Sequence, residues 1–140
     1  MTKGIFTACA IAALSTILHA APALAAPDVY VCTLQAKDNA WVAENIVISH
    51  DAAAGRVRIN DPLIQSINGR AVDGEVRQNT NRRLTLGWDL RDVEVGSQRV
   101  ARFAYRLTLY RGTGKAVVTA KPLGFSNTFL GRGTCAKQGA

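Results

Sequence analysis

Cysteine is the residue type with the most reactive side chain here, and two cysteines stand near the ends of the chain that follows residue 26. Cys32 lies in VYVCTLQ and Cys135 in GRGTC. Thiols can form a disulfide, bind a metal or act as nucleophiles. A metal site needs more ligands than two distant thiols and one histidine, and no C-x-x-C pair is present. We therefore expect a structural disulfide between Cys32 and Cys135.

The other candidate residues for acid-base or metal chemistry are poorly spaced for it. His50 and Asp51 are neighbours, but adjacent residues of a strand point to opposite faces, so they are not expected to act as a base and its orienting acid. Asp89, Asp92 and Glu94 lack the ligand spacing of a calcium loop. We predict no catalytic residue, no metal site and no cofactor, and hence a protein that is not an enzyme.

The first 26 residues are typical of a secretory signal peptide. Lys3 precedes an apolar run over residues 5–18, and Ala23 and Ala25 supply the small-residue pattern of a cleavage site. The run is shorter than the roughly 20 residues that a bilayer span needs. Cleavage after Ala25 or Ala26 would leave 27–140 as a single domain. We expect a periplasmic or secreted protein, in a compartment where a disulfide persists.

A strongly basic composition narrows the choice of partners. The chain has a formal net charge of +7, and removal of Lys3 with the leader would leave +6. Such a surface favours anionic partners. Nucleic acid is not expected, because aromatic residues are few and Phe103 and Tyr105 look inward, so no basic strand also displays a row of aromatic rings for stacking.

Alternation of apolar and polar residues predicts strands along most of the chain. The longest run is residues 98–111, in which Phe103, Tyr105, Leu107 and Leu109 share one face. We predict seven or eight short strands, including one over 71–78, and no amphipathic helix. The expected fold class is all-β: a small antiparallel up-and-down barrel, with a β-sandwich as the alternative.

The barrel is preferred because the first and last strands each carry a cysteine. These strands are neighbours in a closed sheet, where a Cys32–Cys135 disulfide would join them at the seam. The outward faces carry Arg, Asp and Thr, so we do not expect the processed chain to span a membrane.

Three arginines form the predicted anion-contacting cluster. If residues 92–97 are a loop, Leu86 lies opposite Phe103, and Arg83 comes near Arg106 on the outer face. Arg102 lies on the same face. Like charges facing each other across a sheet are unfavourable, and an anionic partner would relieve their repulsion.

A second candidate for binding is the irregular segment KPLGFSNTFLG, residues 121–131. Gly124, Ser126 and Asn127 interrupt an otherwise apolar stretch there and predict an interaction loop. The leading interpretation is a non-catalytic binding or accessory module of the cell envelope that contacts an anionic glycan, lipid or envelope protein. The alternative is a periplasmic inhibitor that blocks an exported hydrolase through this loop.

Short motifs at both ends give the chain a family resemblance. It resembles small exported proteins of α-proteobacteria that begin with VYVC, carry a central strand like Arg83 to Trp88, and end with G-x-G-x-C, here GRGTC. In plan it is also similar to the periplasmic inhibitors of c-type lysozyme, through the Y-x-C of Tyr30 and Cys32. That resemblance implies an eight-stranded barrel closed by a disulfide. The inhibitors' Ser-Gly-rich loop has no counterpart in this sequence.

Overall fold

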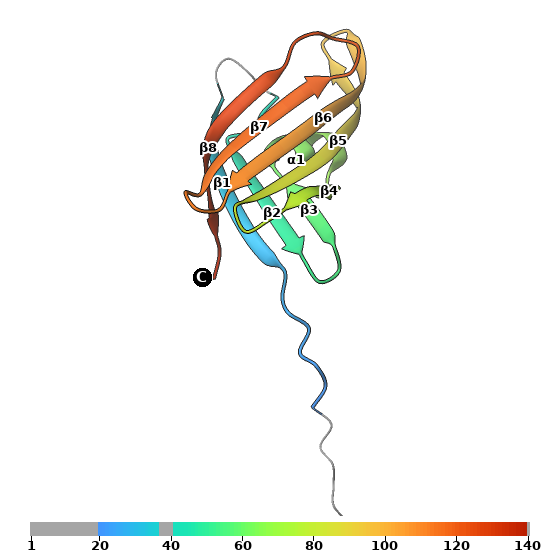
Figure 1. Cartoon of the computed structure of the whole chain (residues 1–140). Helices are drawn as coiled ribbons and strands as arrows, with labels where there is room; N and C mark the ends of the chain where they lie inside the picture. Colours follow the sequence, from blue (N-terminus) through green and yellow to red (C-terminus); the bar gives the residue numbers. More distant parts are fainter. Residues whose placement is uncertain (1–19, 37–40, 140) are drawn as a thin grey trace, which may run out of the picture.

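Eight antiparallel strands close into a barrel in the computed structural model, which describes residues 20–36 and 41–139. Each strand pairs with the next in sequence, and the first pairs with the last, so the predicted up-and-down barrel is confirmed (Figure 1). The strands are β1 (Asp28–Ala36), β2 (Asn45–Asp51), β3 (Arg56–Asn60), β4 (Val72–Asn79), β5 (Arg83–Val95), β6 (Gln98–Tyr110), β7 (Lys115–Pro122) and β8 (Phe129–Lys137).

The core follows the alternation of the sequence. Phe103, Tyr105, Leu107 and Leu109 of β6 are each at most 3% exposed, as predicted. The Trp88 ring stacks on that of Tyr105, with the two centroids 5.1 Å apart. Large side chains therefore fill the middle of the barrel.

The seam between β1 and β8 is closed by a disulfide. Cys32 lies directly opposite Cys135 in the register of the two strands, and the two are bonded. Gly131 and Gly133 precede Cys135 on the same inward side of β8. A Cβ atom at Gly133 would overlap the carbonyl oxygen of Thr33 on β1. In the GRGTC motif, the glycines therefore let β8 approach β1 closely, and the cysteine links the two strands covalently.

The β5–β6 hairpin is longer than the sequence suggested. β5 runs to Val95, and β6 starts at Gln98 after a two-residue turn at Gly96, whose φ is 60°. The predicted loop over 92–97 is wrong, and so is its register, since Leu86 faces Leu107 instead of Phe103. Asp92 has a φ of 54°, and the inward side of β5 changes there from even to odd positions. This break in alternation made the strand look like a loop.

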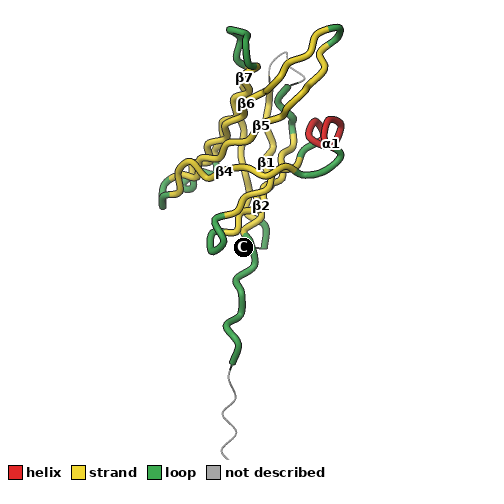
Figure 2. The backbone as a smooth tube through the Cα atoms, turned by 90° about the vertical axis from the view of Figure 1, so that its right-hand side faces the viewer, coloured by secondary structure: helices red, strands yellow, loops and turns green. Residues whose placement is uncertain are grey.

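The sequence analysis predicted no amphipathic helix, but the structure contains one short helix. α1 (Pro62–Asn68) begins after Asp61, whose side-chain Oδ1 accepts the Ile64 backbone N–H at 2.6 Å. It ends at Gly69 in the left-handed conformation, with a φ of 68°. The helix lies at the side of the barrel in the connection from β3 to β4, and Ile64 is fully buried (Figure 2). Within the described ranges, no helix is long and apolar enough to cross a bilayer.

The barrel has two different ends. The turns β2–β3, β4–β5 and β6–β7 share one end with the C-terminus and with the start of β1, and we call this end the mouth. The β5–β6 turn and the connection from β7 to β8, residues 123–128, lie at the opposite end, which we call the loop end (Figure 1). Residues 20–27 run away from the mouth as an exposed segment. Residues 1–19 of the expected leader lie outside the described residues.

Candidate functional site

The predicted interaction loop lies at the loop end and is exposed. Gly124, Ser126 and Asn127 are all solvent-exposed, and Gly124 takes a φ of 85°. The backbone N–H of Leu123 donates to the carbonyl oxygen of Arg102 at 2.8 Å, which ties the start of the loop to β6. The loop is therefore anchored at one side while its central residues face solvent.

Two large apolar side chains on this loop face solvent. Leu123 is 56% exposed and Phe125 is 44% exposed. Phe125 and Asn127 also line an apolar depression of about 100 Å³. The other residues that line it are Trp41, Val95, Gln98, Val100, Phe103, Pro122 and Phe129. We call the group Trp41, Leu123, Phe125 and Phe129 the loop-end surface.

Core aromatic residues pack against the rings of this surface. Trp41 lies over Phe103 with 4.6 Å between ring centroids, and Phe103 contacts Phe129 at 6.4 Å. The Tyr105 hydroxyl donates to the carbonyl oxygen of Trp41 at 2.9 Å. Burial raises the pKa of Tyr105, so this hydroxyl keeps its proton and remains a donor. The sequence did not single out Trp41 or Phe125, although Phe125 lies inside the predicted loop.

The three predicted anion-contacting arginines lie on the outer face but are spread along it. Arg106 faces Gly87, whereas Arg83 faces Tyr110, four positions further along the hairpin. Four residues of a strand span about 14 Å. Arg102 faces Arg91, and Asp89 lies 3.8 Å from each of these two guanidinium groups. Asp89 therefore offsets the directly opposed pair Arg91 and Arg102. Anion binding at the three predicted arginines stays a prediction.

His50 and Asp51 take separate roles in the structure. Asp51 pairs with Arg56 at 3.6 Å and accepts the Ala54 N–H at 3.0 Å, which holds the β2–β3 turn. His50 is only 3% exposed on the inner side of β2, and its Nδ1 has no hydrogen-bond partner. Burial lowers the pKa of His50, and the nearby Arg111 lowers it further. His50 is thus held neutral near the mouth.

The described residues contain no cluster of three or more histidine, cysteine, aspartate or glutamate side chains that would suit a metal ion. They do contain a charged cavity at the mouth that the sequence analysis missed. Asp28, Arg111 and Lys137 meet there although they come from three separate parts of the chain. The sequence did contain one indication of this cavity. Each of the three charged residues lies two positions beyond an inward-facing residue at the end of an alternating run.

Comparison with known proteins adds no relative. No protein-family model matches the chain, and no curated protein or solved structure matches it. The family resemblance noted from its short motifs stays a prediction, and the functional argument rests on the geometry of the barrel.

Proposed function

We propose that this chain is a non-catalytic, exported binding module that docks a protein partner through the loop-end surface. The observation that carries the proposal is the pair Leu123 and Phe125, two large apolar side chains exposed beside an apolar depression. Clustered exposed apolar groups around a shallow pocket are typical of the centre of a protein–protein interface. Trp41, Phe103 and Phe129, whose rings contact one another, line the same depression as Phe125.

The charge of the neighbouring strand indicates what the partner offers. Lys121, at the end of β7 just before the loop, is exposed and forms no ion pair with another described residue. A complementary surface would present an apolar side chain to the depression with acidic residues around it. An exported hydrolase whose cleft receives the loop is one such partner, and that role is the inhibitor function considered from the sequence. The predicted leader and the disulfide support an exported location.

The test compares how two surface variants capture a partner from envelope extract of the cell of origin. Leu123→Ser with Phe125→Ser removes the apolar side chains, and Val47→Ser, at a residue 41% exposed on β2, is the matched control. We expect one envelope protein to bind the native chain and the control with a defined stoichiometry. With that partner purified, calorimetry should show binding at least about tenfold weaker for the double variant. Equal affinity of the double variant would refute docking at the loop end.

A second candidate function is contact with anionic surfaces through the outer face of β5 and β6. Arg83 and Arg106 are exposed, and neither forms an ion pair with another described residue. Arg102→Ser with Arg106→Ser should then reduce retention on heparin and on phosphatidylglycerol vesicles, and added salt should reduce retention of the native chain. Unchanged retention would remove this candidate.

A further inference from the structure

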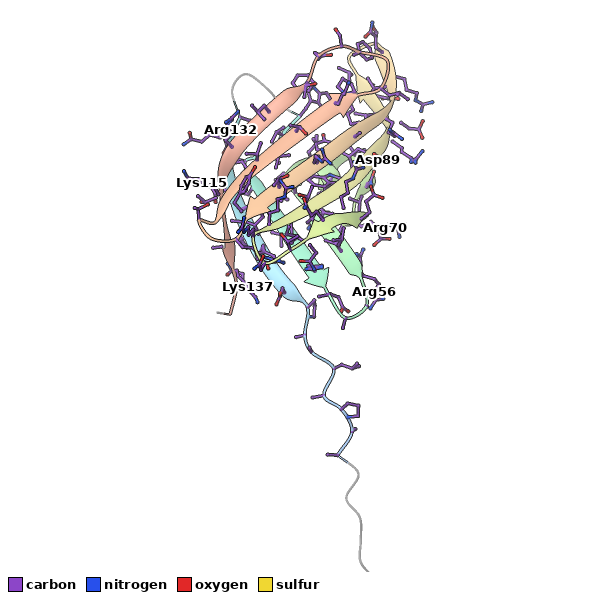
Figure 3. The ribbon with its side chains drawn as sticks, in the orientation of Figure 1. Arg56, Arg70, Asp89, Lys115, Arg132 and Lys137 are labelled. Carbon is purple, nitrogen blue, oxygen red and sulfur yellow. A yellow bond between two sulfur atoms is a disulfide. The ribbon has the colours of Figure 1, made fainter. Side chains whose placement is uncertain are left out.

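Four polar side chains converge at the mouth because of strand alternation. Asp28 precedes Tyr30 by two residues on β1, and Lys137 follows Cys135 by two residues on β8. His50 and Arg111 stand in the same relation to Ile48 and Leu109. Side chains two apart on a strand share a face, so all four continue the inward rows of the barrel toward the mouth. Of the four, His50 stays buried. Figure 3 shows Lys137 and Arg56 at this end of the barrel.

A cavity of about 450 Å³ opens beside three of them, Asp28, Arg111 and Lys137. Its apolar part consists of Tyr30, Leu109 and Cys135, and its polar part of Asp28, Arg111 and Lys137, with Gly114 completing the lining. Tyr30, Leu109 and Cys135 are all buried, so they form a well-packed floor of the cavity. A cavity of this size lies within the range that holds small molecules in proteins.

Two cations line the cavity, and one of them has no acidic partner among the described residues. Lys137 Nζ lies 2.9 Å from Asp28 Oδ1, so these two offset each other. Arg111 donates one Nη1 hydrogen bond to the carbonyl oxygen of Thr80 and has no ion pair with another described residue. His50 lies close enough to Arg111 and Asp28 for both to act on its pKa, and its buried Nδ1 is unpartnered.

We propose that the mouth binds a small amphiphilic carboxylate. The guanidinium of Arg111 would hold the carboxylate, since arginine pairs with planar oxyanions through two parallel hydrogen bonds. The short hydrocarbon chain would cover Tyr30, Leu109 and the disulfide. A neutral alcohol would leave Arg111 unpaired, and an amine would be repelled by Arg111 and Lys137. This site lies at the end of the barrel opposite the loop-end surface, and it stands or fails independently of the proposed function.

The test measures binding of octanoate to the oxidised protein by calorimetry at neutral pH. We expect saturable binding at one site, with neither octanol nor inorganic phosphate binding comparably. Arg111→Gln should weaken octanoate binding roughly ten- to hundredfold, the range expected for loss of a charge-assisted hydrogen bond. Arg132→Gln is the matched control, because Arg132 is an exposed arginine on β8 away from the mouth (Figure 3).

A second variant is expected to change octanoate affinity in the opposite direction, and it keeps the test decisive if Arg111→Gln disturbs the β6–β7 turn. Asp28→Asn removes the acid that pairs with Lys137, so octanoate should bind severalfold more tightly. The proposal is overturned by absence of saturable octanoate binding at about 10 mM, by equal binding of octanol, or by weaker binding to Asp28→Asn. Binding to phosphatidylglycerol vesicles without binding of octanoate would assign anion contact to the outer arginines and also overturn it.

Discussion

His50 shows how the position of a single side chain sets the pH dependence of stability. Because burial and Arg111 lower its pKa in the folded chain, the unfolded chain binds a proton first as the pH falls. The stabilising contribution of the neutral ring is complete above the unfolded pKa of about 6.5 and is lost progressively below it. We expect the free energy of unfolding of the native chain to fall as the pH drops below about 6.5.

His50→Gln should remove that part of the decline, because glutamine does not titrate. Urea unfolding at several pH values, with the two proteins compared at each pH, isolates the effect from the carboxylates that both share. Asp61, whose pKa is raised by burial, is one of these shared groups. Parallel pH profiles for the two proteins would show that His50 takes up its proton as easily when folded as when unfolded.

At the scale of the strand, β8 depends on glycine for its contact with β1. Gly133→Ala would place a methyl group on the Thr33 carbonyl oxygen, a backbone atom that cannot turn aside. We expect the free energy of unfolding to fall by about 3 kcal/mol, at the upper end of the range for overpacking. Gly112→Ala is the control, since nothing lies within 4 Å of a Cβ atom there. Similar urea midpoints for both variants would mean that the strands separate without cost.

At the scale of the helix, Asp61 caps α1 from a position that is only 6% exposed. Asp61→Ala would leave the buried Ile64 N–H without its acceptor and should cost about 1 to 2 kcal/mol of unfolding free energy. Asp61→Ser keeps an acceptor oxygen and removes a partly desolvated charge, so its stability should stay close to native. Urea unfolding of the two variants distinguishes capping from charge. Equal losses would indicate that the carboxylate itself is required.

The sequence predicted most strands of this barrel because their inward rows alternate without a break. It failed where local geometry interrupts that rule. The positive φ of Asp92 shifts the inward row within β5, so one continuous strand looked like a strand and a loop. α1 is too short for a helical periodicity to emerge, although Asp61, Pro62 and Gly69 carry its start and stop signals. The mouth was missed because its charges come together only when the sheet closes.

For the molecule as a whole, closure joins two surfaces of different character at opposite ends of one rigid core. The loop end presents apolar side chains on an aromatic base, and the mouth presents charged side chains above an apolar floor. The same inward rows of strands β1, β6 and β8 support the mouth and continue through the core. A change at the seam between β1 and β8 should therefore lower the stability of the whole barrel, and it should not act on one surface alone.

The disulfide at that seam offers the test of closure. Cys32 and Cys135 are 103 residues apart, and replacing both with alanine should lower the free energy of unfolding by about 4 to 5 kcal/mol in the chain-entropy model. The unfolded chain should also expand, so the urea m-value should rise as well. Val118→Ala, at a fully buried residue of β7, is the control, because it removes core volume and should lower stability without changing the m-value. A double variant as stable as the native protein would show that strand pairing alone holds β1 against β8.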